Sequence, residues 1–350
     1  MDTRTFATFI QVSQYVGTCI ANPLNVFLIY LILTKSPKKV GNYRYLMIYV
    51  AVFEIIFSVI AIITEPFIHS FTTRVIVLVK VRGSIFNRET CFLLDCLMCA
   101  FYGSSMTVFS IHFLYRYASL HTSARKWFEG WKLFLWMMIP QFLAVVWFVM
   151  YYLFLGPTPE FTEFIRQDLF DDFDIDVDDV TYVGPYYYPQ DKQGIHELDW
   201  TAFWVMTVVW IMVGVSAIAV FVGGYGCYTK ISSGLAMSSN SAQSKNIQKQ
   251  LFNALVMQSA IPFLLMYLPT TVVLFCTFIR QNIGSTSLFI SYSVAVYPAI
   301  DPLPTILIIK NYRNATYDIL MRFCLCKRKA QKSQNNSSNI RMQQMQASGI

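Results

Sequence analysis

The sequence predicts an all-α membrane protein, a bundle of seven transmembrane helices, and three observations support that fold class. Of its 350 residues 55% are hydrophobic and only 13% are charged, whereas about a quarter of the residues of a soluble domain are charged. Seven stretches of about 20 or more mostly apolar residues are each long enough to cross a bilayer. They lack the alternating polarity of barrel strands, so helices are the structure that can span with them. This composition excludes a soluble globular enzyme.

Charged residues bound each predicted span. The spans run approximately over residues 6–33, 45–68, 91–115, 133–155, 200–227, 251–279 and 287–309. We expect the first to stay in the mature chain, because it is longer than the apolar part of a signal peptide and lacks a small-residue cleavage site. A short juxtamembrane helix at 311–323 completes a membrane domain over residues 1–326, and the Gln-, Ser- and Asn-rich segment 327–350 is predicted to be disordered.

Lysine and arginine are distributed unevenly between the two sides of the predicted bundle. The odd-numbered loops and the tail hold 19 of the 27 Lys and Arg residues. Because basic loops stay on the cytoplasmic side, the N-terminus is predicted outside and the C-terminus in the cytoplasm. The net charge of +7 comes from short clusters between apolar runs rather than from one basic face, so nucleic-acid binding is not expected.

Four motifs lie at or near the predicted inner ends of the spans. They read GNYRYLM at 41–47, HFLYRY at 112–117, QKQLFNALVMQSAIPFLLMYLP at 248–269 and YPAIDPLPTILIIKNYR at 297–313. Together they resemble the Str class of nematode serpentine chemoreceptors, and the resemblance extends from the first span to Arg313. It implies a seven-span receptor in the ciliary membrane of chemosensory neurons, with a small volatile odorant as ligand and a heterotrimeric G protein as partner.

Arg116, with Tyr117 beside it, ends the third span at the predicted inner face. A cation there can cap the last helix carbonyls or bind a partner from inside. Arg116 resembles the Arg of the Asp-Arg-Tyr triplet in rhodopsin-like receptors, but Tyr115 stands where those receptors have the acid of their ionic lock. The alternative is an arginine that merely extends its charge to the membrane interface.

Asp301 and Pro302 lie in a proline-rich part of the seventh span, where missing backbone N–H groups permit a hinge. Glu54 lies at a comparable depth in the second span. The two carboxylates either share a proton or a cation that biases the receptor between states, or each is hydrogen-bonded within the bundle. We expect a switch role for Asp301 and a structural one for Glu54.

Pro262 and Pro269 weaken the hydrogen bonding within the sixth span, so that its inner end, with Lys245 and Lys249, can swing outward. The two lysines would then offer a basic rim to a G protein. The alternative is that they belong to an ordinary basic loop, 229–250, that only fixes the topology.

The fourth loop, 156–199, carries twelve acidic residues against two basic ones. A loop of this length is often a lid over a ligand entrance, and its tyrosines at 182 and 186–188 are candidates to line one. The alternative is a solvated, mobile acidic loop. Calcium binding is not expected, because the glycine and the closing glutamate of a calcium loop are missing.

The ligand pocket is expected in the outer half of the bundle, between spans three, five, six and seven. The candidate lining residues, which offer aromatic rings, sulfur and a few polar groups, are Asp95, Met98, Cys99, Tyr102, Trp204, Met206, Tyr267 and Tyr292. Such a cavity suits a small volatile organic molecule. The alternative for each residue is helix packing or lipid contact.

Cysteines suggest lipidation rather than a metal site. Cys324 and Cys326 adjoin a basic run after the juxtamembrane helix and are candidate palmitoylation sites. A bridge between Cys91 and Cys276 is left open. No pattern indicates a metal, a cofactor or a catalytic site. Besides the receptor, a ligand-gated channel or transporter and a ligand-free scaffold remain alternatives, although four spans without charge offer little of a conduction path.

Overall fold

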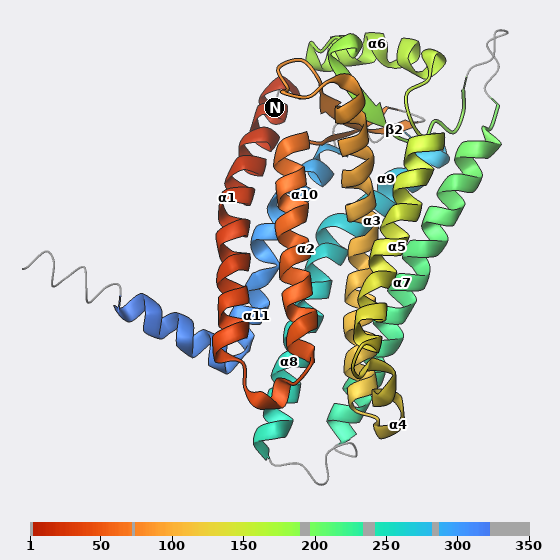
Figure 1. Ribbon diagram of the computed structural model, residues 1–350. Coiled ribbons are helices and arrows are strands. Elements are labelled where there is room, and N and C mark those ends of the chain that lie inside the picture. The colour runs from red at the N-terminus through yellow and green to blue at the C-terminus, as the bar shows by residue number, and fades with distance from the viewer. Residues whose placement is uncertain (1–2, 72–73, 190–196, 234–241, 282–286, 323–350) are drawn as a thin grey trace, which may run out of the picture.

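Seven helical spans pack side by side in the computed structural model, which describes residues 3–71, 74–189, 197–233, 242–281 and 287–322 (Figure 1). The first five spans are α1 (Thr3–Lys35), α2 (Tyr43–Thr64), α3 (Arg88–Ser119), α5 (Lys132–Phe154) and α7 (Trp200–Ser233). The sixth combines α8 (Ala242–Pro262), a π-helical segment (Phe263–Tyr267) and α9 (Leu268–Phe278), and the seventh combines α10 (Leu288–Ile300) and α11 (Pro302–Ile308). The predicted seven-helix bundle is confirmed.

Short elements complete the end of the bundle that holds Arg116. They are the 3-10 turns Lys38–Val40 and Lys126–Phe128 and helix α4 (Thr122–Arg125). A helix over Lys310–Arg322 follows the seventh span at a bend of 102°. Extended backbone at Ile309 (ψ 109°) makes this corner. We call this the basic end of the bundle.

The predicted boundaries of the second, fifth and sixth spans are each wrong at one end. The second span ends at Thr64 and not at 68, because Glu65 adopts a left-handed conformation (φ 45°) and Pro66 follows it. The fifth and sixth spans extend to Ser233 and from Ala242, so Lys245 and Lys249 lie on helix α8 and not in a loop. Both lysines are exposed there.

A three-stranded antiparallel sheet lies across the other end of the bundle and was not predicted. It consists of β1 (Phe67–Phe71), β2 (Arg74–Lys80) and β3 (Val180–Val183), in the order β1-β2-β3, with Val77 opposite both Ile68 and Val183. Side chains alternate across a strand. Val75 therefore packs toward the helices, whereas Ile76 and Leu78 pack against the acidic fourth loop.

The fourth loop is an ordered cover in its described part. Helix α6 (Pro159–Phe173) begins with a proline and with the Thr158 hydroxyl accepting from the N–H of Phe161. Its apolar face, including Ile165 and Leu169, packs on the sheet. A 3-10 turn (Val177–Asp179) then leads into β3. We call β1–β3 and α6 together the cap. The packed helix α6 and strand β3 differ from a mobile acidic loop, and a role as a lid over a ligand entrance stays a prediction.

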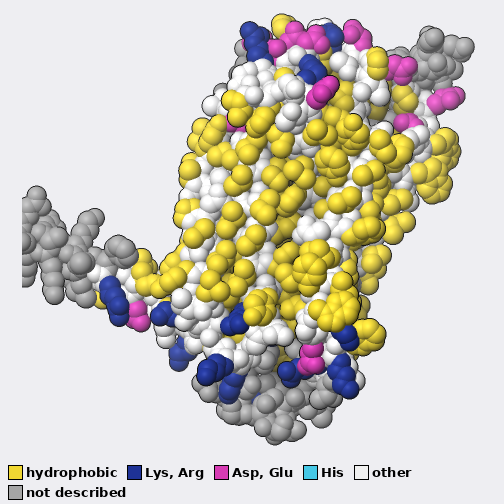
Figure 2. All heavy atoms as spheres, viewed as in Figure 1, with side chains coloured by type: hydrophobic (Ala, Val, Ile, Leu, Met, Phe, Trp, Pro, Cys, Tyr) yellow, Lys and Arg dark blue, Asp and Glu magenta, His cyan; other side chains and the backbone are white. Residues whose placement is uncertain are grey.

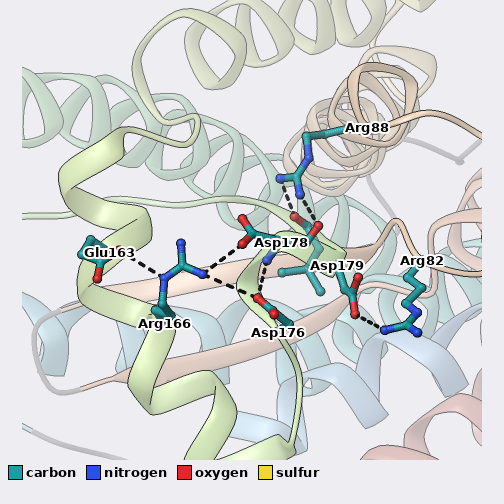
Figure 3. A network of polar contacts seen from close by, with 8 residues as sticks. Arg82, Arg88, Glu163, Arg166, Asp176, Asp178 and Asp179 are labelled. Carbon is teal, nitrogen blue, oxygen red and sulfur yellow. Dashed lines mark hydrogen bonds and ion pairs between the residues drawn. The ribbon is translucent and has the colours of Figure 1, made fainter.

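Arginines from three segments contact acidic side chains or backbone carbonyls of the fourth loop (Figure 3). Arg166 pairs with Glu163 (Nε–Oε2 3.1 Å) and Asp178 (Nη1–Oδ2 3.0 Å). Arg82 pairs with Asp179 (Nη1–Oδ2 3.0 Å), and Arg88 donates to the backbone carbonyls of Asp178 and Val180. Exposed pairs are individually weak, so these contacts fix the geometry of the cap more than they stabilise the fold.

The surface divides into three zones. Figure 2 shows Asp and Glu side chains gathered over the cap, Lys and Arg at the basic end, and a broad hydrophobic band between them. Large apolar side chains such as Phe142 and Ile218 are exposed in this band. Among the described residues, six helices are long and apolar enough to cross a membrane, and the bent pair Leu288–Ile308 and Lys310–Arg322, counted together, is a seventh. The protein is therefore a multi-pass membrane protein.

Candidate functional site

A small apolar cavity of about 90 Å³ lies between the helices and the sheet at the cap end. Its lining residues are Pro66, Ile68, Val75, Val77, Met98, Cys99, Tyr102, Trp147, Tyr151, Gly184, Pro185, Val209, Thr270, Leu274 and Val294. An apolar cavity of 150 Å³ binds benzene. By that scale, this one holds about four non-hydrogen atoms of a ligand.

Three of the eight predicted ligand residues line this cavity: Met98, Cys99 and Tyr102, all on one face of α3. Asp95 lies on the same face, one turn nearer the cap, and is completely buried. Tyr267 lies beside the cavity and bonds to α3.

The other three predicted ligand residues lie elsewhere. Met206 is buried in the cluster that contains Tyr187. Trp204 is 59% exposed on the outside of the bundle. Tyr292 stacks on Phe9 with ring centroids 5.4 Å apart. These three do not line the cavity.

The sequence interpretation missed several lining residues. Val75 and Val77 come from the unpredicted sheet. Trp147 and Tyr151 form an i, i+4 aromatic pair in the fourth span, with ring centroids 5.7 Å apart. Such spacing puts both rings on one helix face, and that signal was available in the sequence.

Hydrogen bonds beside the cavity connect α3 to the π-helical segment of the sixth span. The Tyr102 hydroxyl lies 2.6 Å from Thr270 Oγ1 and donates to the carbonyl of Met266 (3.0 Å). The Tyr267 hydroxyl donates to the carbonyl of Tyr102 (2.8 Å) and accepts from the N–H of Met106 (2.8 Å). Pro262 and Pro269 bracket this segment, so a break in regular helix coincides with several polar contacts between the two spans.

Buried carboxylates occupy the middle of the bundle. Tyr297 donates to Glu54, and Gln258 Nε2 donates to Asp301 (3.1 Å) while its Oε1 accepts from Thr305 (2.8 Å). Each carboxylate is thus hydrogen-bonded within the bundle, which is one of the two expected arrangements. Asp301 joins the sixth span to the seventh, directly before the buried Pro302.

Arg116 forms a polar latch at the basic end. Arg116 is 4% exposed, and its guanidinium donates to Gln248 Oε1 (2.8 Å) and to the Gln248 carbonyl (3.1 Å) and lies 4.6 Å from the ring centroid of Tyr43. Arg116 therefore does not simply extend to the membrane interface but bonds to Gln248 of α8. Tyr117 is exposed. A cavity of about 420 Å³ opens beside the latch, lined by Arg116, Gln248 and residues of the first and third loops.

The interior of the cap contains two basic side chains. The guanidinium of Arg74 lies over the rings of Phe164 and Tyr186, with its carbon 3.0 and 4.8 Å from their centroids, and burial lowers its pKa to about 10. Burial also lowers the pKa of His69 to about 4. The His69 ring packs edge-on against Phe173 of α6.

The predicted cysteine roles have different outcomes. Cys91 and Cys276 are both free, so the bridge left open between them is not formed. Cys324 and Cys326, and the tail 327–350, lie outside the described residues.

Comparisons with known proteins agree with this architecture. The sequence model of a family described as serpentine type 7TM GPCR chemoreceptor Str matches residues 10–317. The chain is 33% identical to the G-protein coupled receptor str-217 of Caenorhabditis elegans, over 86% of this chain and 87% of the relative. It is 27% identical to the serpentine receptor class r-10 of Caenorhabditis briggsae, over 99% of both chains.

A solved structure shares the fold. The crystal structure of squid rhodopsin superposes with a TM-score of 0.62 at 12% identity, covering 93% of this chain and 88% of that one. At this identity the likeness establishes the fold alone. The family match over nearly the whole chain carries the conclusion: the protein belongs to the Str family of serpentine seven-transmembrane G-protein-coupled chemoreceptors.

Proposed function

We propose that the protein binds a small volatile odorant in the cap-end cavity and activates a heterotrimeric G protein at the basic end. The cap then faces the extracellular side, and the ciliary membrane of a chemosensory neuron is the proposed location. The concentration of Lys and Arg at the basic end supports this orientation. The size and apolar lining of the cavity support a small organic ligand.

The observation that carries the proposal is the double role of Tyr102. Its ring lines the cavity, and its hydroxyl contacts Met266 and Thr270 of the sixth span. A ligand that displaces this ring changes the contacts at the π-helical segment. Because proline and π-helical geometry weaken the helix there, the inner part of the sixth span can swing about the π-helical segment.

Movement of the sixth span would open the basic end. Gln248 lies on the inner part of that span, so an outward swing takes it away from Arg116. The freed guanidinium, the exposed Tyr117, and Lys245 and Lys249 would then face a G protein. The ligand acts by binding the open arrangement more tightly than the closed one.

Asp301 and Pro302 provide the connection to the seventh span. The bond from Gln258 to Asp301 ties the sixth span to the start of α11. An outward swing of α8 would stretch or break that bond, and the prolines allow the seventh span to adjust. We assign Asp301 a positioning role in this switch.

The test is a G-protein activation assay in cells expressing the protein, across small volatile ketones, alcohols, esters and amines. An active odorant should lose its effect in Arg116→Ala at equal surface expression. In Tyr102→Phe, which keeps the ring and removes the hydroxyl, the odorant should still bind while the maximal response falls. A current evoked by ligand without a G protein, or a full response in Arg116→Ala, would contradict the proposal.

A further inference from the structure

Asp95 differs from the other buried acids of the helical bundle. Glu54 accepts a hydrogen bond from Tyr297, and Asp301 accepts one from Gln258. Asp95 is 0% exposed, and neither of its carboxylate oxygens has a hydrogen-bond partner among the described residues. Burying a carboxylate without a partner is costly. The side chain is therefore an acceptor whose partner does not come from the described part of the protein.

The position of Asp95 connects it to the cap-end cavity. Residues 95, 98, 99 and 102 follow helical spacing along one face of α3, and the last three line the cavity. Asp95 is not itself a lining residue; it lies on that face within about one turn of Met98 and Cys99, on the cap side of the apolar cavity.

We infer that Asp95 is the counter-ion for a small protonated amine whose hydrocarbon part fills the cap-end cavity. An ionised carboxylate only accepts hydrogen bonds, so it can bind a ketone or an ether only after it takes up a proton. An ammonium group donates up to three and also brings the compensating charge. The inference rests on the proposed function in that it names the ligand class of the same cavity.

Two further features agree with a cationic ligand. The acidic side chains over the cap give the approach to the cavity a negative potential, which concentrates cations near it. The cavity of about 90 Å³ limits the ligand to a short alkyl chain or a small ring. Small primary amines of this size are volatile when neutral and protonated in water at neutral pH.

The test compares isobutylamine with isobutanol, which has the same carbon skeleton and no charge. Binding at pH 7 is measured from ligand-dependent shifts in the Tm of the purified full chain in lipid nanodiscs without G protein. Other amines of three to six non-hydrogen atoms are then measured in the same way. Isobutylamine should bind at least tenfold more tightly than isobutanol. Asp95→Asn should remove that preference and leave isobutanol binding within about threefold, because charged hydrogen bonds are worth roughly 1.5–3 kcal/mol.

The controls separate this inference from the proposed function. Asp318→Asn makes the same change on an exposed residue of the juxtamembrane helix and should keep the amine preference. Asp95→Asn should fold about as stably as the parent, because the carboxyl makes no hydrogen bond to the described residues that the variant would lose. Equal binding of amine and alcohol, an amine preference that survives Asp95→Asn, or no binding by any amine would overturn the inference, even if neutral odorants activated a G protein. Amine binding that depends on Asp95 but never activates a G protein would support the inference and contradict the proposed function.

Discussion

Removing the amide of the latch should raise signalling in the absence of ligand. Gln248→Ala deletes the acceptor of the 2.8 Å bond from Arg116 Nη1 and leaves the bond to the Gln248 carbonyl in place. Hydrogen bonds to charged groups contribute about 1.5–3 kcal/mol. Because Gln248 is half-buried and one bond survives, we expect the closed arrangement to lose about 1.5 kcal/mol of stability relative to the open one.

That free energy changes the equilibrium between closed and open receptor about tenfold. If about 1% of the receptor is open without ligand, the variant should have about 10% open. Basal G-protein activation, measured by bioluminescence energy transfer and divided by surface expression, should rise by the same factor. Gln248→Glu should have the opposite effect, because a carboxylate pairs with Arg116 more strongly than an amide does.

Asn246→Ala is the matched control, since it truncates an exposed amide on the same helix that does not contact Arg116. Its basal signal should equal that of the parent. The reasoning would be refuted if Gln248→Ala and Gln248→Glu changed basal signalling in the same direction, or if neither changed it.

Three further predictions concern the cap and the packing around the cavity. Burial lowers the pKa of His69 to about 4 in the folded cap, whereas the unfolded chain protonates this ring below pH 6.5, so the free energy of unfolding should fall between pH 6.5 and 4 by up to about 3 kcal/mol. Thermal melts of the parent and of His69→Gln would show this slope, and a slope unchanged by the variant would contradict the prediction. Gly103→Ala places a Cβ 2.3 Å from Trp147 Cε2 and should lower the Tm by several degrees at about 1–3 kcal/mol of overpacking, whereas an unchanged Tm would show that the ring moves freely. Arg74→Lys loses the flat stack of the guanidinium on Phe164, which costs about 1 kcal/mol, and should raise the rate of hydrogen exchange in α6 about fivefold or more. An equal exchange rate in α6 would show that this stack does not stabilise the cap.

The seven spans could be predicted from long apolar runs, because a bilayer imposes a similar length and composition on every segment that crosses it. The sheet escaped prediction for a related reason. The apolar run through Pro66 and Ile68 reads as a continuation of the second span, and only the left-handed Glu65 separates helix from strand. The β-branched run at Val75–Val79 was a usable strand signal.

The candidate site could be predicted in part. Met98, Cys99 and Tyr102 follow helical spacing, and the sequence places them together on α3. The prediction that Trp204 lines the cavity is wrong, because a span that is apolar on every side has no pattern to show which face meets lipid and which meets protein. The pairing of Arg116 with Gln248 joins residues 132 positions apart, and sequence spacing within one helix cannot reveal such a contact.

The cap has a consequence for the timing of the response. Since sheet strands line the cavity and α6 covers the strands, a route out of the proposed site through the cap requires these packed elements to open. Opening of packed elements takes microseconds or longer and limits the departure rate independently of affinity. Under the proposed function, such a receptor would average the odorant concentration over the residence time of each bound molecule.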